Sequence, residues 1–144
     1  MKKSVLTLLI LGASYSFLLA QACAPGWDFY RSITVDNSAG ETLTDYQVEF
    51  SLNTAELVSE GKLQADGSDL RVFADDCTPL PFWGDSLGSS TNTRIWVKIP
   101  SFAAGTSLDL QVYYGNTEVE DATDGDNTFI FFDDFSSDEV DTTK

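Results

Sequence analysis

The side chains of this chain that can do chemistry are mainly carboxylates, since 23 of its 144 residues are Asp or Glu and none is His. The lack of histidine excludes a Ser-His-Asp or Cys-His catalytic apparatus and imidazole ligation of zinc. Two carboxylates about 5 to 10 Å apart can hydrolyse a glycosidic bond, but among so many acids such a pair arises by chance. The sequence therefore assigns no catalytic residue and predicts a protein that is not an enzyme.

Two short stretches are dense in oxygen atoms that can bind calcium. The first runs from Asp66 to Asp69 around a glycine, and the second contains Asp121, Asp124 and Asp126. Carboxylates at this spacing can hold a hard cation, so both stretches are candidate calcium sites. The alternative for the first is an Asx-type turn before a strand. The second lacks the glutamate that an EF-hand loop requires. Calcium is the one cofactor that these patterns suggest.

Large aromatic residues and an arginine form the candidate ligand site. Trp96 and Tyr113 fall on the faces of their segments opposite the aliphatic residues, and Arg94 shares that face with Trp96. Together with Trp83 they suit a sugar ring or a protein partner, because both bind to aromatic platforms beside hydrogen-bonding groups. The alternative is that these aromatics only cover the edges and the hydrophobic seam of a sheet.

The elements that position these residues have the two-residue period of β-strands. Two such runs lie between residues 93 and 116, and their predicted inward residues are Ile95, Val97, Ile99, Leu108, Leu110 and Val112. The residues between the runs include Pro100 and Gly105, which suit a return turn. Residues 93–116 are therefore predicted to form a β-hairpin.

The rest of the chain adds further strands and one helix. Strands are predicted over residues 27–36, 44–52, 70–74 and 77–83. The first two are expected to pair as a second hairpin. Asn53 and Glu56 have the spacing of a capping box, which predicts one or two helical turns over residues 53–60. We expect an all-β, antiparallel β-sandwich, immunoglobulin-like or jelly-roll-like, with about seven or eight strands and one short helix.

Residues 1–22 have the features of a secretory signal peptide: two lysines at the start, an apolar stretch, and small residues before the cleavage position. This pattern predicts a secreted or cell-surface protein with no membrane span after signal removal. In an oxidising compartment, Cys23 and Cys77 are expected to form a disulfide. Lipidation of Cys23 and two free thiols are the alternatives.

The net charge of −15 repels nucleic acid and an anionic bilayer surface. The aromatic residues make a glycan or a surface protein the expected partner. Composition changes after Asn116, where an acidic stretch surrounds the apolar residues 129–132. We expect a signal peptide at residues 1–22 and a β-sandwich domain at residues 23–116. Residues 117–144 are expected to be an acidic linker and the first strand of a following domain, through which self-assembly by strand addition is an option.

Six blocks of residues, in order, carry a family resemblance. They are Trp27 with Tyr30 to Asn37, Leu43 to Val48, Ala65 to Arg71, Leu80 to Trp83, Trp96 to Pro100, and Tyr113 to Asn116. These blocks resemble the domain of unknown function 2341 family, which is similar to β-sandwich modules of exported and cell-surface proteins. The segment Phe131 to Phe135 resembles the start of the concanavalin-like (laminin-G-like) domain that commonly comes after it.

The resemblance implies no reaction. The expected function is a non-catalytic extracellular module with an adhesive, carbohydrate-contacting or structural role. Two alternatives stay open: an accessory domain of a secreted glycan-active enzyme, and a filament subunit that assembles through its C-terminal strand.

Overall fold

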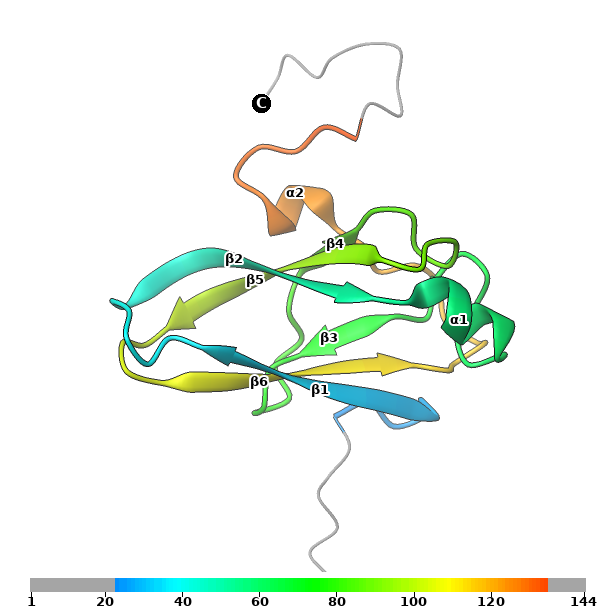
Figure 1. Ribbon diagram of the computed structural model, residues 1–144, viewed down its shortest axis with the longest axis horizontal. Coiled ribbons are helices and arrows are strands. Elements are labelled where there is room, and N and C mark those ends of the chain that lie inside the picture. Colours follow the sequence, from blue (N-terminus) through cyan, green and yellow to red (C-terminus); the bar gives the residue numbers. More distant parts are fainter. Residues whose placement is uncertain (1–22, 135–144) are drawn as a thin grey trace, which may run out of the picture.

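Two three-stranded antiparallel sheets pack face to face in the computed structural model, which describes residues 23–134 (Figure 1). In chain order the elements are β1 (Phe29–Asp36), β2 (Leu43–Leu52), α1 (Thr54–Ser59), β3 (Arg71–Phe73), β4 (Phe82–Gly84), β5 (Thr93–Phe102), β6 (Ser107–Tyr114) and α2 (Gly125–Thr128). The predicted signal peptide lies outside the described residues. Within them, no helix is long and apolar enough to cross a membrane. The fold class is the predicted antiparallel β-sandwich.

Sheet topology differs from the prediction at both expected hairpins. The first sheet has the order β1-β6-β3 and the second has the order β2-β5-β4. The hairpin predicted over residues 93–116 is therefore wrong, because β5 and β6 lie in different sheets. The hairpin predicted from residues 27–36 and 44–52 is wrong for the same reason, since β1 pairs with β6 and β2 pairs with β5. Each of these connections crosses between the sheets, so that the apolar faces of successive strands face each other and bury one another.

The core lies between the two sheets, where the sequence pattern placed it. The most deeply buried of its predicted residues are Ile95, Val97, Ile99, Leu110 and Val112, each at most 1% exposed. Leu108 is half-buried. Full burial of one aliphatic side chain stabilises a fold by roughly 1.5–3 kcal/mol. The facing strands β5 and β6 therefore supply much of the hydrophobic stabilisation.

The short helix α1 begins as predicted. The Oδ1 atom of Asn53 accepts a hydrogen bond from the backbone N–H of Glu56, and its Nδ2 atom donates to the Glu56 carboxylate. Residues 23–134 contain six strands and two short helices, fewer strands and one more helix than expected. The additional helix is α2. Residues 129–134 form no strand in the structure, and the first strand of a following domain, expected within residues 117–144, stays a prediction.

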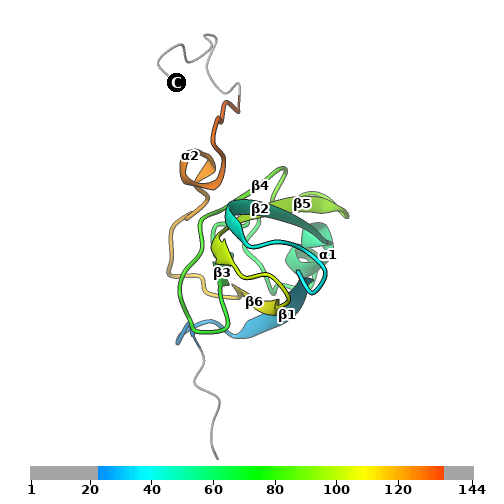
Figure 2. The same cartoon turned by 90° about the vertical axis from the view of Figure 1, so that its left-hand side faces the viewer.

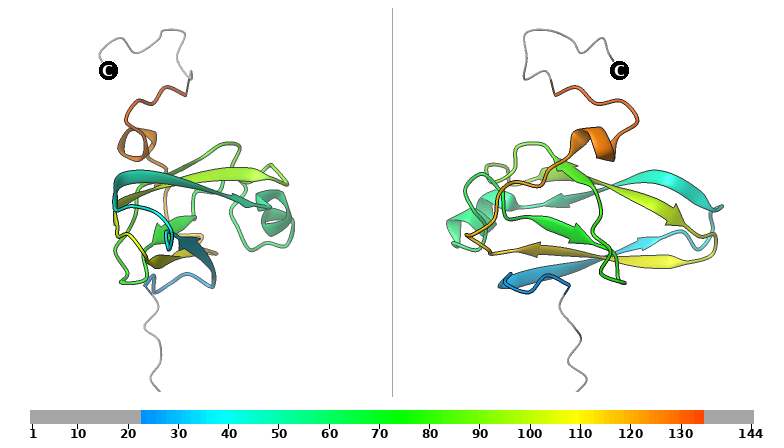
Figure 3. Two further views of the ribbon diagram at one scale, coloured as in Figure 1. Left: turned by 60° about the vertical axis from the view of Figure 1, so that its left-hand side comes forward. Right: turned by 180° about the vertical axis from the view of Figure 1, so that it is seen from behind.

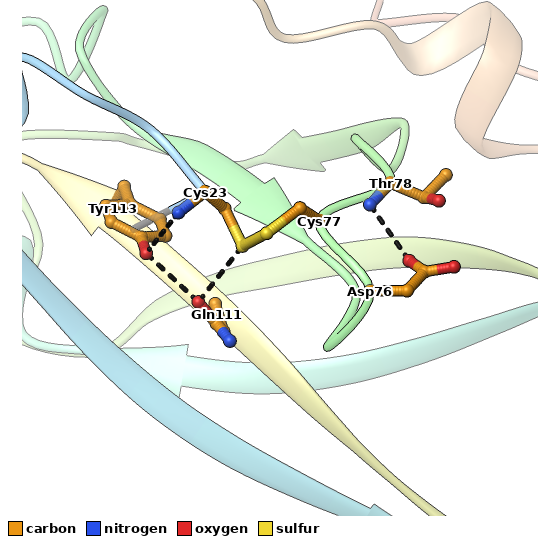
Figure 4. Close-up of a disulfide and its surroundings, with 6 residues drawn as sticks. All are labelled: Cys23, Asp76, Cys77, Thr78, Gln111 and Tyr113. Carbon is orange, nitrogen blue, oxygen red and sulfur yellow. Dashed lines mark hydrogen bonds between the residues drawn. A yellow bond between two sulfur atoms is a disulfide. The ribbon is translucent and has the colours of Figure 1, made fainter. Parts of the chain in front are cut away.

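A disulfide joins Cys23 to Cys77, which confirms the predicted pairing (Figure 4). Neither described cysteine is free, so the structure contradicts both a lipid on the Cys23 sulfur and the pair of free thiols. The bond fixes the first described residue to the loop that comes after β3.

Candidate functional site

Trp83 and Trp96 lie side by side on the outer surface of the second sheet. They are directly paired in the register of β4 and β5, and their ring centroids are 5.6 Å apart. Their neighbours in sequence, Phe82 and Val97, point inward and are buried. Alternation along a strand therefore forces both indoles outward. We call this surface, with Trp83, Trp96, Arg94 and Glu49, the tryptophan face.

Arg94 is fixed against the Trp96 ring. Its guanidinium carbon lies 4.6 Å from the ring centroid, a cation–π geometry. The same guanidinium donates two hydrogen bonds to the carboxylate of Glu49, with an Nε–Oε1 distance of 3.0 Å. This pairing lowers the pKa of Glu49 and raises the pKa of Arg94. An exposed ion pair contributes little to stability, so the main effect of this pair is to hold polar groups beside an aromatic ring.

The end of the described chain covers part of the tryptophan face. Residues 124–133, which we call the strap, contain α2 and lie outside the second sheet (Figure 2). The backbone N–H of Asp124 donates to the carbonyl of Phe82 at 2.8 Å. The side chain of Gln47 donates to the carbonyl of Thr128 at 3.0 Å. Two polar contacts therefore dock α2 on β4 and β2.

Aromatic rings complete the docking of the strap. The centroid of Phe132 lies 5.2 Å from that of Trp83, and the centroid of Phe129 lies 5.9 Å from that of Trp96. Both contacts are edge-to-face, and the two phenylalanines stack on each other at 5.9 Å. The two indoles thus pack on the outer surface of the second sheet and against the strap, in part as the alternative interpretation of these aromatics predicted. The apolar residues 129–132 within the acidic stretch are the sequence feature from which this contact could have been predicted.

A cleft of about 360 Å³ remains between the tryptophans and the strap. It is lined by Trp83, Trp96, Phe129, Phe131, Phe132 and Asp133. Its volume lies within the range of about 300–1,000 Å³ that is usual for small-molecule sites. Three of the four predicted ligand residues, Trp83, Trp96 and Arg94, therefore lie together beside a cavity.

Tyr113 lies elsewhere, on the outer surface of the first sheet. It stacks on Tyr30 at 5.4 Å and meets Phe73 edge-on at 5.6 Å. Its hydroxyl accepts a hydrogen bond from the Cys23 N–H and donates one to Gln111 (Figure 4). We call this surface, with Tyr30, Tyr113, Phe73 and Gln111, the tyrosine face. The prediction that grouped Tyr113 with Trp96 is wrong, because β5 and β6 belong to different sheets and their outer faces point in opposite directions.

The predicted calcium ligands of the first stretch bind backbone N–H groups. Asp69 is 1% exposed; its carboxylate accepts from the N–H groups of Gln64, Gly115 and Asn116. Asp66 accepts from the N–H of Ser68, and this hydrogen bond lowers the pKa of Asp66. The geometry is that of the Asx-type turn. Asp69 also ties the start of β3 to the end of β6.

The second stretch is arranged in the same way. Asp121 accepts from the N–H and the hydroxyl of Thr123. Asp124 caps α2 by accepting from the N–H of Asn127, while Asp126 lies exposed in the first turn. In the part of the chain that the structure describes, no three His, Cys, Asp or Glu side chains lie close enough to hold a metal ion. Calcium binding at these residues stays a prediction.

Comparison with known proteins adds one finding. A family model described as a domain of unknown function (DUF2341) matches residues 66–144. The matched span includes Trp83, Trp96 and the strap. No curated protein and no solved structure matches the chain. The predicted domain division at residue 116 stays a prediction, although the strap contacts the sandwich closely.

Proposed function

Since this chain belongs to the domain of unknown function (DUF2341) family, whose description states no activity, we propose a function from the geometry of the site. The protein is a non-catalytic, exported β-sandwich module that binds a glycan at the tryptophan face. The observation that carries this proposal is the pair of outward indoles, 5.6 Å apart, at the wall of the cleft.

A sugar ring matches the chemistry of this face. The C–H groups of a pyranose form an apolar surface that packs on an aromatic ring, while its hydroxyls need hydrogen-bond partners. The ring of Trp96 is half-buried, and the Arg94–Glu49 pair lies directly beside it. Arg94 supplies donors and Glu49 supplies acceptors, both held in fixed positions by their mutual hydrogen bonds.

The charge of the protein narrows the class of glycan to neutral sugars. The chain has a net charge of −15, Asp133 lines the cleft, and Arg94 is already paired with a carboxylate. A uronic or sialic acid would enter a field of like charge, which lowers both its affinity and its association rate. Neutral hexoses carry no such penalty.

Glycan binding is tested by titrating the full chain with neutral oligosaccharides and following the heat of binding. Trp96→Ala is expected to weaken binding at least tenfold. Tyr30→Ala is the matched control, because it removes an exposed aromatic from the tyrosine face and is expected to leave the affinity unchanged. An equal loss in both variants, or no binding to any neutral glycan, would refute the proposal.

A second part of the proposal concerns the chain beyond the strap. The resemblance of Phe131 to Phe135 to the start of a concanavalin-like domain supports such a domain directly after the tryptophan face. Residues 129–134 form no strand in the structure, so any strand of that domain begins later in the chain. The gene sequence beyond the codon for Lys144 tests this part independently of glycan binding.

A further inference from the structure

One side of the sandwich is open along part of its length. The short strand β3 pairs with β6 only at residues 111–113, and the short strand β4 pairs with β5 only at residues 95–97. The longer strands β5 and β6 continue past these partners, as Figures 1 and 3 show. Each long strand therefore has a stretch of edge that neither β3 nor β4 covers.

A groove lies between these two uncovered edges. It has a volume of about 350 Å³, and we call it the edge groove. Leu80, Ile99 and Leu108 give it an apolar floor, and Asp75 and Asp76 stand at its rim. None of the residues that line it is basic. The edge groove is separate from the cleft on the tryptophan face, with which it shares no lining residue.

The backbone at this edge does not suit the addition of another strand. The N–H of Lys98 donates to the carbonyl of Pro81, so the backbone N–H of Lys98 points toward the side of β5 on which β4 lies. The backbone N–H and C=O groups of alternate residues in an antiparallel strand point toward the same neighbour. The backbone of Pro100 therefore points the same way, beyond the end of β4, where the edge of β5 is open. Proline has no N–H to donate to an incoming strand. A side chain that brings its own donors fits this edge better than a backbone that needs one.

The rim favours a positively charged group. The carboxylate of Asp76 accepts a hydrogen bond from the N–H of Thr78 at 2.9 Å, which lowers the pKa of Asp76. Asp75 is exposed beside it. With a net charge of −15 on the chain, the field at the rim attracts cations and opposes a second copy of this acidic protein.

We propose that the edge groove binds a lysine or arginine side chain from a basic segment of a partner protein. The aliphatic stem of that side chain lies on Leu80, Ile99 and Leu108, and its charged head reaches Asp75 and Asp76. Long basic side chains combine an apolar stem with a charged end in this way. Several donors on the head match the two carboxylates at the rim. This site is independent of glycan binding.

The test uses a defined probe, a fluorescently labelled peptide acetyl-Ser-Arg-Val-Arg-Ser-amide, with the full chain at physiological salt. Binding is followed by fluorescence anisotropy. The double variant Asp75→Asn, Asp76→Asn is expected to weaken binding at least fivefold. Asn at position 76 can still accept from the Thr78 N–H, so the loop is retained, and thermal unfolding verifies this. The matched control is Glu118→Gln, Glu120→Gln, which removes the same charge at exposed positions and is expected to change the affinity less than twofold.

Two further measurements place the binding and define its chemistry. Amide shifts on adding the peptide should cluster at residues 74–80 and 99–101. A peptide with citrulline in place of arginine keeps the shape but removes the charge, and it is expected not to bind. Equal losses in both double variants, binding of the citrulline peptide, or no binding of the arginine peptide would overturn the proposal. Self-association of the chain that the Asp75, Asp76 variant abolishes would overturn it as well.

Discussion

The two outer faces of the sandwich are each covered by one end of the described chain, but by different forces. On the tyrosine face, Cys23 is bonded covalently to Cys77, and its N–H donates to the hydroxyl of Tyr113. On the tryptophan face, the strap is held by ring contacts and hydrogen bonds only. The first cover stays attached as long as the disulfide is intact, whereas the second depends on noncovalent contacts alone.

This difference between a covalent and a noncovalent cover explains why, of the two outer faces, the tryptophan face retains a cleft. Tyr113 is only 3% exposed beneath the covalently fixed segment. Trp83 and Trp96 stay half-buried and line a cleft of about 360 Å³. A tight covalent cover suits a stabilising role, whereas a cover of side-chain contacts leaves room for binding. The comparison therefore favours a stabilising role for the tyrosine face, and it agrees with our proposal that ligands bind at the tryptophan face.

The largest expected effect comes from breaking the covalent cover. The disulfide spans 54 residues of sequence, and the chain-entropy model gives a stabilisation of about 4 kcal/mol for a loop of this size. Replacing both Cys23 and Cys77 by serine should lower the free energy of unfolding by up to that amount, measured by urea unfolding. Wild-type protein unfolded with a reductant is the control and should lose a similar amount. A loss below about 1 kcal/mol would contradict the stabilising role of this face.

A smaller effect is expected from loosening the strap. Phe129→Ala with Phe132→Ala removes the edge-to-face contacts with Trp83 and Trp96, and we expect a loss of about 2 kcal/mol in the free energy of unfolding. Tryptophan fluorescence should shift to longer wavelength as the indoles gain water. Ile130→Ala is the matched control, because this side chain is 96% exposed and should change stability by less than about 0.5 kcal/mol. Equal effects of the two variants would show that the ring contacts do not hold the strap.

The smallest effect is a pH dependence confined to the strap. The N–H of Asn127 donates to Asp124 and lowers the pKa of Asp124, with a smaller contribution from Lys98. A depressed carboxyl pKa stabilises the folded form above its ordinary value of 3.8, and this stabilisation is lost as the pH falls through the folded pKa. Tryptophan fluorescence should therefore report loosening of the strap on the acid side of that value.

Asp124→Asn is the control for this pH effect. Asparagine can cap α2 without titrating at position 124, so the acid transition of the strap should shrink in this variant. An unchanged transition would assign it to other carboxylates.

The sequence predicted which residues face inward but not which strands are neighbours. The alternation of Ile95, Val97 and Ile99 is a local property, and it correctly placed these residues in the core. Pairing depends on contacts between residues far apart in sequence, such as Ile33 with Leu110, which no local pattern encodes. For this reason both hairpins were wrong although most strands were correct.

The candidate site was predicted in part for the same reason. Trp83, Trp96 and Arg94 were grouped correctly because they share one sheet. Tyr113 was misplaced because its strand crosses to the other sheet. The strap was missed because its aspartates were interpreted as calcium ligands and Phe129 as the start of a strand, whereas Asp124 and Asn127 form a local helix cap. The disulfide was predicted correctly, since only two cysteines were available to pair.

The disulfide also determines how the described domain would respond to mechanical tension between Cys23 and Asp134. The covalent path passes directly from Cys23 to Cys77, so the residues between them, which include β1, β2, α1 and β3, cannot be extended while the disulfide is intact. Only the chain beyond Cys77 can be extended, to a contour length of about 200 Å at roughly 3.5 Å per residue. Reduction would about double that length. A module stretched between two surfaces would thus lengthen only through the residues after Cys77 while the bond is intact.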